Sequence, residues 1–120
     1  MSDNSGQLSG KVSIRVDGDF IATENEATLT PDGVKRDPIR HGGKTYFSEE
    51  ETAPELVCKV LLTKDVDVIK LNQITNATVL FEADTGQKYY MRGAFSTEVV
   101  PFEGKGIAEM KMSANTVEKV

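Results

Sequence analysis

The segment from Ala77 to Phe95 carries the strongest local pattern in the chain: two alternating stretches joined by a short polar turn. In its first arm Val79 and Phe81 share one face of an extended chain, a period of two that is typical of a β-strand. The tripeptide Asp84-Thr85-Gly86 favours a hairpin turn, because Gly adopts positive φ at no steric cost. In the second arm, alternation places on one face Tyr89, Met91, Gly93 and Phe95. Both faces mix large apolar with charged groups, which indicates a hairpin in a protein that assembles.

The other segments extend this β pattern. A first hairpin is predicted from Lys11 to Ala22, with Asp17-Gly18 as a strong two-residue turn. Glu26 to Thr30 extends its second strand or forms a short strand of its own. The run from Glu55 to Thr63 is the most apolar in the chain and rich in branched side chains, which predicts a buried strand central in a sheet. The single cysteine, Cys58, lies in this run and is predicted to be a buried, inert thiol.

A short helix is predicted from Lys64 to Ile74, with Asp65 as a capping residue. A strand is predicted from Thr97 to Glu103, at a sheet edge or bulge because it contains a proline, which cannot donate to a ladder. The turn Gly104-Lys105-Gly106 then leads into a strand from Ile107 to Met112.

These elements predict a mainly β fold, an antiparallel β-sandwich or partly open β-barrel of six to eight strands with one short flanking α-helix. The expected organisation is a flexible arm over residues 1–10, a single domain over 11–114 and a loose tail over 115–120. Within the domain, residues 31–44 hold two prolines and three glycines, which predicts a long loop.

The loop and the segment after it carry opposite charges. The loop contains four basic side chains against two aspartates, and the run Glu49-Glu50-Glu51 follows it. Two interpretations stay open: a solvated surface, or complementary patches on neighbouring subunits.

Composition and motifs argue against an enzyme, a cofactor and a metal site. The net charge of -5 disfavours a protein that holds nucleic acid by neutralising phosphates. No Gly-rich phosphate loop occurs, and His41, the only histidine, has no second His or Cys nearby. Asp65-Val66-Asp67 begins like a calcium loop but lacks the Gly and Glu that such a loop needs. The start has no signal-like segment, and no apolar run approaches ~18 residues, so a cytosolic chain without a membrane span is expected.

Two functional alternatives depend on single features. Asp84-Thr85-Gly86 has the sequence of an aspartic protease active site, although its polar neighbours favour a turn over the buried, paired carboxylates of such enzymes. A small sugar- or peptide-binding β-sandwich would need an aromatic platform, whereas the chain has no Trp and three Tyr.

The order of these segments resembles the tail tube proteins of Mu-like contractile-tailed bacteriophages and prophages. The resemblance rests most on ATVLFEADTGQKYYMRGAF followed by GKGIAEMKMSA, with support from KVSIRVDG, the long loop and the short helix, and it covers about residues 10–114. It implies a structural β-sandwich that forms hexameric rings, stacked into a hollow tube inside a contractile sheath. The ring-forming tube protein of type VI secretion shares this architecture and is the nearest alternative.

The resemblance also implies partners and a location. The partners are further copies of the chain, the tail sheath protein and the terminator and baseplate proteins, with DNA passing through without specific binding. The location is the virion tail, and the host cytoplasm during assembly. A lumen lined mainly by Asp and Glu follows from the sign of the net charge, because it would not retain phosphates. Inter-subunit contacts are assigned, as a hypothesis, to Leu8, Lys35, Arg36, Asp37, Arg40, His41, Tyr46, Glu49 and Glu50.

Overall fold

The computed structural model describes residues 12–120, which form ten strands and one short helix. In chain order these are β1 (Val12–Val16), β2 (Asp19–Ile21), β3 (Thr23–Thr30), β4 (Gly33–His41), β5 (Lys44–Thr52), β6 (Glu55–Leu61), α1 (Val68–Asn72), β7 (Ala77–Ala83), β8 (Lys88–Ser96), β9 (Ile107–Ser113) and β10 (Thr116–Lys119). The predicted count of six to eight strands is therefore too low.

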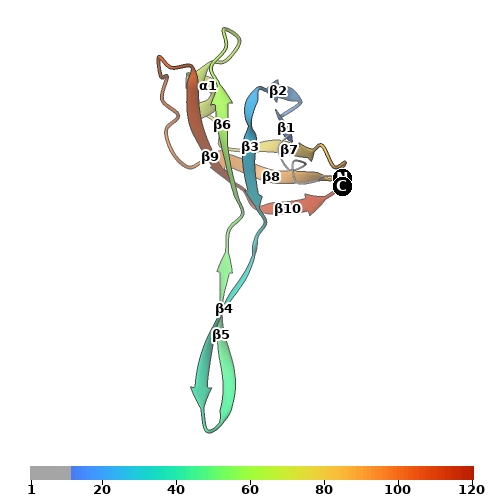
Figure 1. Cartoon of the computed structure of the whole chain (residues 1–120), viewed down its shortest axis with the longest axis vertical. Coiled ribbons are helices and arrows are strands. Elements are labelled where there is room, and N and C mark those ends of the chain that lie inside the picture. Colours follow the sequence, from blue (N-terminus) through green and yellow to red (C-terminus); the bar gives the residue numbers. More distant parts are fainter. Residues whose placement is uncertain (1–11) are drawn as a thin grey trace, which may run out of the picture.

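Eight of these strands form one antiparallel sheet in the order β2-β1-β7-β8-β9-β6-β3, with β10 paired to β8 off this path. The sheet curls until β3 packs against β1, so the body is a nearly closed barrel with α1 beside it (Figure 1). Closure of this kind leaves little unpaired strand edge. The prediction of a mainly β, partly open barrel with one short helix is confirmed.

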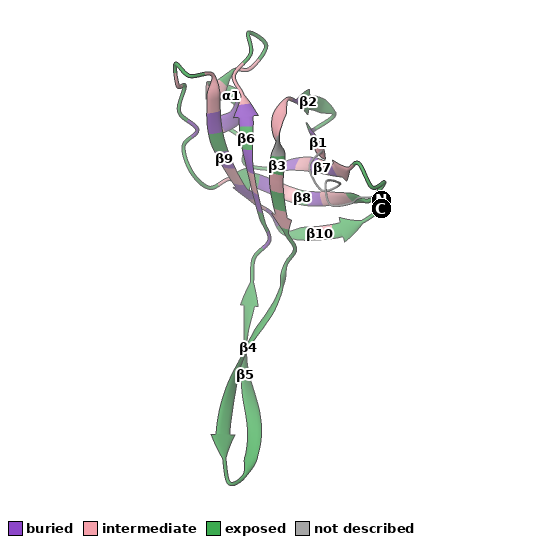
Figure 2. Ribbon diagram, viewed as in Figure 1, coloured by how far each residue is buried: buried purple, intermediate pink, exposed green. Residues whose placement is uncertain are grey.

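The core lies inside this barrel and follows the alternation of the strands. β6, β7 and β9 each bury every second residue, which appears as bands of purple along the ribbon in Figure 2. β6 lies between β3 and β9, as predicted for the most apolar run. Cys58 on β6 is 1% exposed, and burial, with a smaller contribution from Glu109, raises the pKa of its thiol to about 12. The thiol is buried and protonated at neutral pH, and the prediction of an inert cysteine is confirmed.

The β7–β8 hairpin forms as predicted, with its turn at Asp84-Thr85-Gly86 and Gly86 at a φ of 95°. Its second arm differs from the expectation, because Gly93 is an extra residue that the register of β7 skips, at a φ of 69°. Such a bulge reverses the alternation beyond it. Ala94 is therefore buried and Phe95 is exposed, so the predicted placement of Phe95 on the face of Met91 is wrong.

The first hairpin also forms as predicted. Asp17 and Gly18, at φ values of 50° and 89°, make a two-residue turn between β1 and β2. Two positive φ angles in succession are the signature of a type I′ turn, whose twist matches that of the paired strands. The helix is present but shorter than predicted, and its cap is Asp67, whose carboxylate accepts a hydrogen bond from the Ile69 amide at 3.0 Å. The assignment of the cap to Asp65 is wrong.

The predicted strand over residues 97–103 is wrong, because this segment is irregular. The Asn72 side chain takes the place of a neighbouring strand: its Oδ1 accepts from the Val100 amide at 2.7 Å, and its Nδ2 donates to the Val100 carbonyl at 3.1 Å. Val100 is thereby held in the core at 1% exposure. The apolar residues of this segment therefore do not form a strand, and one of them, Val100, fixes the segment to the core.

Two predicted irregular segments are strands. Residues 31–44, predicted as a long loop, belong to the β4–β5 hairpin, and residues 115–120, predicted as a loose tail, contain β10. Neither shows clean alternation, because the hairpin is exposed on both faces and β10 is exposed at three of its four residues. The predicted arm, residues 1–10, lies outside the described residues.

Candidate functional site

The β4–β5 hairpin projects from the barrel as a separate two-stranded sheet (Figure 1). Every residue from Pro31 to Ala53 is exposed, so the whole projection is green in Figure 2. The radius of gyration is 17.3 Å, against roughly 14 Å for a compact chain of this length. A lone two-stranded hairpin is marginally stable in water, which makes this projection a candidate binding element.

The hairpin exposes apolar side chains on both of its faces. Ile39 pairs with Tyr46 on one face, and Pro38 pairs with Phe47 on the other. Ile39, Tyr46 and Phe47 are 50%, 53% and 58% exposed. Large apolar groups gathered on a projection indicate a protein-binding surface. Because both faces carry them, the hairpin is suited to insertion between two surfaces.

Charge divides the hairpin into two halves. Near the barrel, Arg36 forms an ion pair with Glu49 at 3.4 Å and lies 5.5 Å from the Phe47 ring centroid, and Lys35 stands opposite Glu50. From Pro38 to Phe47, here called the hairpin tip, no carboxylate occurs, and the charged side chains are basic.

The structure brings most of the predicted contact residues together on this one hairpin. These are Lys35, Arg36, Asp37, Arg40, His41, Tyr46, Glu49 and Glu50, and all are exposed. Leu8 lies outside the described residues. The run Glu49-Glu50-Glu51 already faces Val34 to Arg36 across the same hairpin, so its pairing with the basic residues of a neighbouring subunit stays a prediction.

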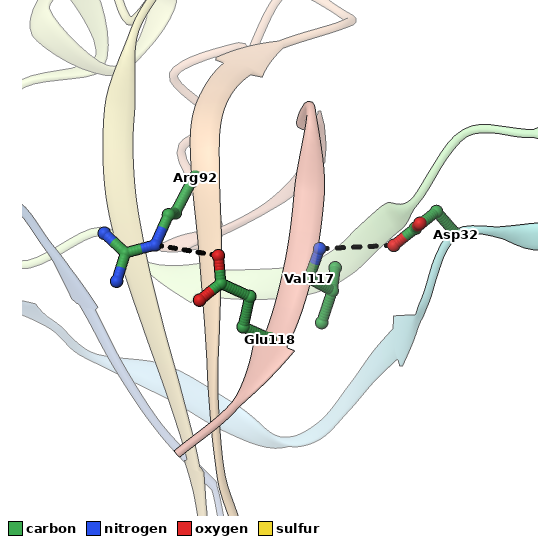
Figure 3. Close-up of polar contacts among 4 residues, drawn as sticks. All are labelled: Asp32, Arg92, Val117 and Glu118. Atoms are coloured by element: carbon green, nitrogen blue, oxygen red, sulfur yellow. Dashed lines mark hydrogen bonds and ion pairs between the residues drawn. The ribbon is translucent and has the colours of Figure 1, made fainter.

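Sequence reasoning missed the residues that hold the root of the hairpin. Asp32 accepts a hydrogen bond from the Val117 amide of β10 at 3.2 Å, and Figure 3 shows the two segments meeting there. Beside it, Arg92 of β8 pairs with Glu118 of β10 at 3.1 Å. Asp32 belongs to Pro31-Asp32-Gly33, a tripeptide that indicates a turn. Nothing in this tripeptide predicts a contact with a strand that is distant in the sequence.

The Asp84-Thr85-Gly86 turn lies elsewhere, exposed at the end of β7 and β8. An aspartic protease needs its carboxylates in a buried, paired setting, which an exposed hairpin turn does not provide. Over residues 12–120 no three His, Cys, Asp or Glu side chains gather as metal ligands. Within the same residues, no helix has the length and apolar character that a membrane crossing requires.

Comparison with known proteins gives a consistent result. The family model for phage tail tube proteins matches residues 5–119. The Mu-like prophage FluMu tail tube protein of Haemophilus influenzae is 36% identical over 115 residues, 95% of this chain and 97% of the relative. The tail tube protein of Escherichia phage Mu is 26% identical over 108 residues, 89% of this chain and 91% of the relative.

Solved structures show the same fold. A chain of the PVC sheath–tube complex of an extracellular contractile injection system, in its extended state, superposes with a TM-score of 0.65 at 14% identity, with 99% of each chain covered. At this identity the likeness concerns the fold alone.

Proposed function

The chain belongs to the phage tail tube protein family, and on that premise we propose that its subunits form hexameric rings that stack into a hollow tube. It is a tail tube subunit of the Mu-like type, a structural protein and not an enzyme. The observation that carries the proposal is the β4–β5 hairpin, which is exposed along its whole length and carries large apolar side chains on both faces.

A hairpin of this kind makes an interface between unlike surfaces, since it projects from one part of the subunit and contacts a different part of the next. Such a head-to-tail contact closes into a ring or continues as a filament, depending on the rotation between subunits. A tube of stacked rings combines the two: subunits close into a ring within each layer, and the layers continue as a filament. β2 and β3, which end the sheet order, are the edges that neighbours within a ring would cover.

The proposed lumen is acidic. The net charge of -5 supports this, because an acidic channel repels phosphates and would release the DNA that passes through it. The proposed partners outside the tube are the sheath, terminator and baseplate proteins of the tail. A map of the assembled tube tests the lumen directly, and a basic or neutral channel would contradict it.

Electron microscopy of the purified full chain tests the proposed assembly. The wild type is expected to form rings or tubes at high concentration. The double variant Ile39→Ser with Phe47→Ser is expected to stay monomeric with an unchanged thermal midpoint, because both side chains are exposed in the subunit. The matched control is Val99→Ser, which removes an apolar side chain that is 82% exposed on a different segment.

Each outcome of this experiment has a clear meaning. A wild type that stays monomeric under all conditions contradicts the assembly. Unchanged assembly of the hairpin variant contradicts the role of the hairpin. Loss of assembly in the Val99 control alone would move the interface to residues 97–106.

A further inference from the structure

A cavity of about 440 Å³ opens on the body between the β1–β2 hairpin, the turn before α1 and α1 itself. Its apolar lining includes Val16, Ile21 and Leu71, which are buried, and the half-buried Ile74. Phe20 stands at the cavity with 59% of its surface exposed. The volume lies within the range of ligand pockets, so the cavity has room for an apolar side chain.

The same cavity is acidic. Asp17, Asp19, Asp65 and Asp67 line it, against one ammonium group, that of Lys70. Two of these carboxylates have structural roles: Asp17 accepts from the Thr78 amide at 2.9 Å, and Asp67 caps α1.

The other two carboxylates are available to a ligand. Asp19 and Asp65 are exposed and form no ion pair with another residue of the described chain. A cavity with an apolar lining and free carboxylates selects a ligand that carries apolar and cationic groups side by side.

The hairpin tip has this chemistry. It exposes Ile39 and Tyr46, a cross-strand pair, on the same face as His41 and Lys44, with Arg40 on the opposite face, and it contains no carboxylate. Nine residues of strand span about 30 Å, enough to reach a neighbouring subunit.

The cavity and the tip lie at opposite ends of the subunit. Figure 1 places α1 and β2 at the end of the body away from the hairpin. A contact between the tip and the cavity would therefore join two copies, in a head-to-tail relation that can repeat without closing on itself.

We propose that the hairpin tip of one subunit docks in the α1–β2 cavity of a second copy. Arg40 and Lys44 then lie against Asp19 and Asp65, and the Ile39–Tyr46 pair contacts the apolar lining. This deepens the proposed tube assembly and rests on it, because it names the surface that receives the hairpin.

A charge swap tests the contact. Arg40→Glu with Lys44→Glu reverses the tip, and Asp19→Lys with Asp65→Lys reverses the cavity. Each reversal alone is expected to lower tube yield by about tenfold or more, because like charges then face each other. All four changes in one chain are expected to restore tubes. Far-ultraviolet circular dichroism and the thermal midpoint establish that each variant is folded.

A cysteine pair gives a second measurement that does not depend on charge. His41→Cys with Asp19→Cys is expected to give disulfide-linked ladders in oxidised tubes, while the buried Cys58 stays unreactive. The matched control, His41→Cys with Thr85→Cys, places the second thiol on the exposed β7–β8 turn and is expected to give none.

The outcomes separate this inference from the assembly itself. Wild-type tubes with no rescue by the charge swap and no ladders overturn the cavity as the receptor while the tube stands. A wild type that forms no rings or tubes overturns both. Rescue together with specific ladders establishes the contact.

Discussion

The β7–β8 and β4–β5 hairpins are the same kind of element, and they differ in what covers them. β7–β8 has β1 on one side and β9 and β10 on the other, and it buries Val79 and Met91 completely. β4 and β5 pair with each other alone, and all of their residues are exposed. The first is stabilised by its own chain, whereas the second packs against no other part of the described subunit. Substitutions in the first should therefore change folding, and substitutions in the second should change assembly.

The largest expected difference between the hairpins is in core packing. Met91→Ala should lower the free energy of unfolding of the monomer by about 2–5 kcal/mol, because it leaves a cavity among buried neighbours. Phe47→Ala, also a large truncation, should change it by no more than about 0.5 kcal/mol, because the ring is 58% exposed. Urea denaturation under conditions that keep both variants monomeric gives the two values. Similar values would mean that the hairpin is covered within the subunit.

The same contrast explains which strands could be predicted from the sequence. Alternation reports burial of one face within a chain, so β1, β6, β7 and β9 were recognisable, and so was the overall fold class. β4 and β5 bury neither face in the subunit, and their two prolines and three glycines over residues 31–44 indicated a loop. The charges of that segment left two interpretations open, a solvated surface or a contact with a neighbouring subunit. The charges could not predict the register of β4 against β5, which places Arg36 opposite Glu49 of its own chain.

Contacts between residues that are distant in the sequence are the second feature that could not be predicted. The hydrogen bonds between Asn72 and Val100 join positions 28 residues apart, and the bond that the Val117 amide donates to Asp32 joins positions 85 residues apart. Neither Asn72 nor Asp32 differs locally from residues that serve a helix or a turn. A single sequence has no signal for such pairs, because each forms only after the sheet has brought distant segments together.

The next effect concerns the bulge that separates the two halves of β8. Gly93→Ala should destabilise the monomer by about 1–3 kcal/mol, because Gly93 has a φ of 69°, which suits glycine. A Cβ there would also clash with the side-chain amide of Asn115. Gly42→Ala, in the β4–β5 turn at a φ of 60°, has nothing within 4 Å and is the control for backbone strain without a clash. Thermal denaturation should give Gly93→Ala a lower midpoint than Gly42→Ala. The reverse order of midpoints would contradict the close approach of Asn115.

A smaller effect is expected where the two regions meet. Asp32→Ala removes the acceptor for the Val117 amide and should cost about 0.5–1.5 kcal/mol. Asp32→Asn keeps an oxygen at the same place and should cost less. Hydrogen exchange at the Val117 amide reports the bond directly, and exchange should speed up in Asp32→Ala while amides of β7 keep their protection. Unchanged exchange at Val117 would show that β10 is held without the root of the hairpin.

The smallest effect tests whether surface charge distinguishes the two regions at all. Arg92–Glu118 joins β8 to β10 and Arg36–Glu49 joins β4 to β5, and in both pairs at least half of each side chain is exposed. Solvent screens such pairs, so double-mutant cycles on the monomer should give a coupling of about 0–1 kcal/mol for each. The cycle for the first pair uses Arg92→Gln and Glu118→Gln, and the matched cycle uses Arg36→Gln and Glu49→Gln, each of which removes a charge and keeps a polar side chain. If burial determines the strength of an ion pair, both coupling energies should be small and similar, since neither pair is buried in the subunit. A coupling well above this range for Arg92–Glu118 alone would mean that charge, and not backbone pairing, holds β10 on the barrel.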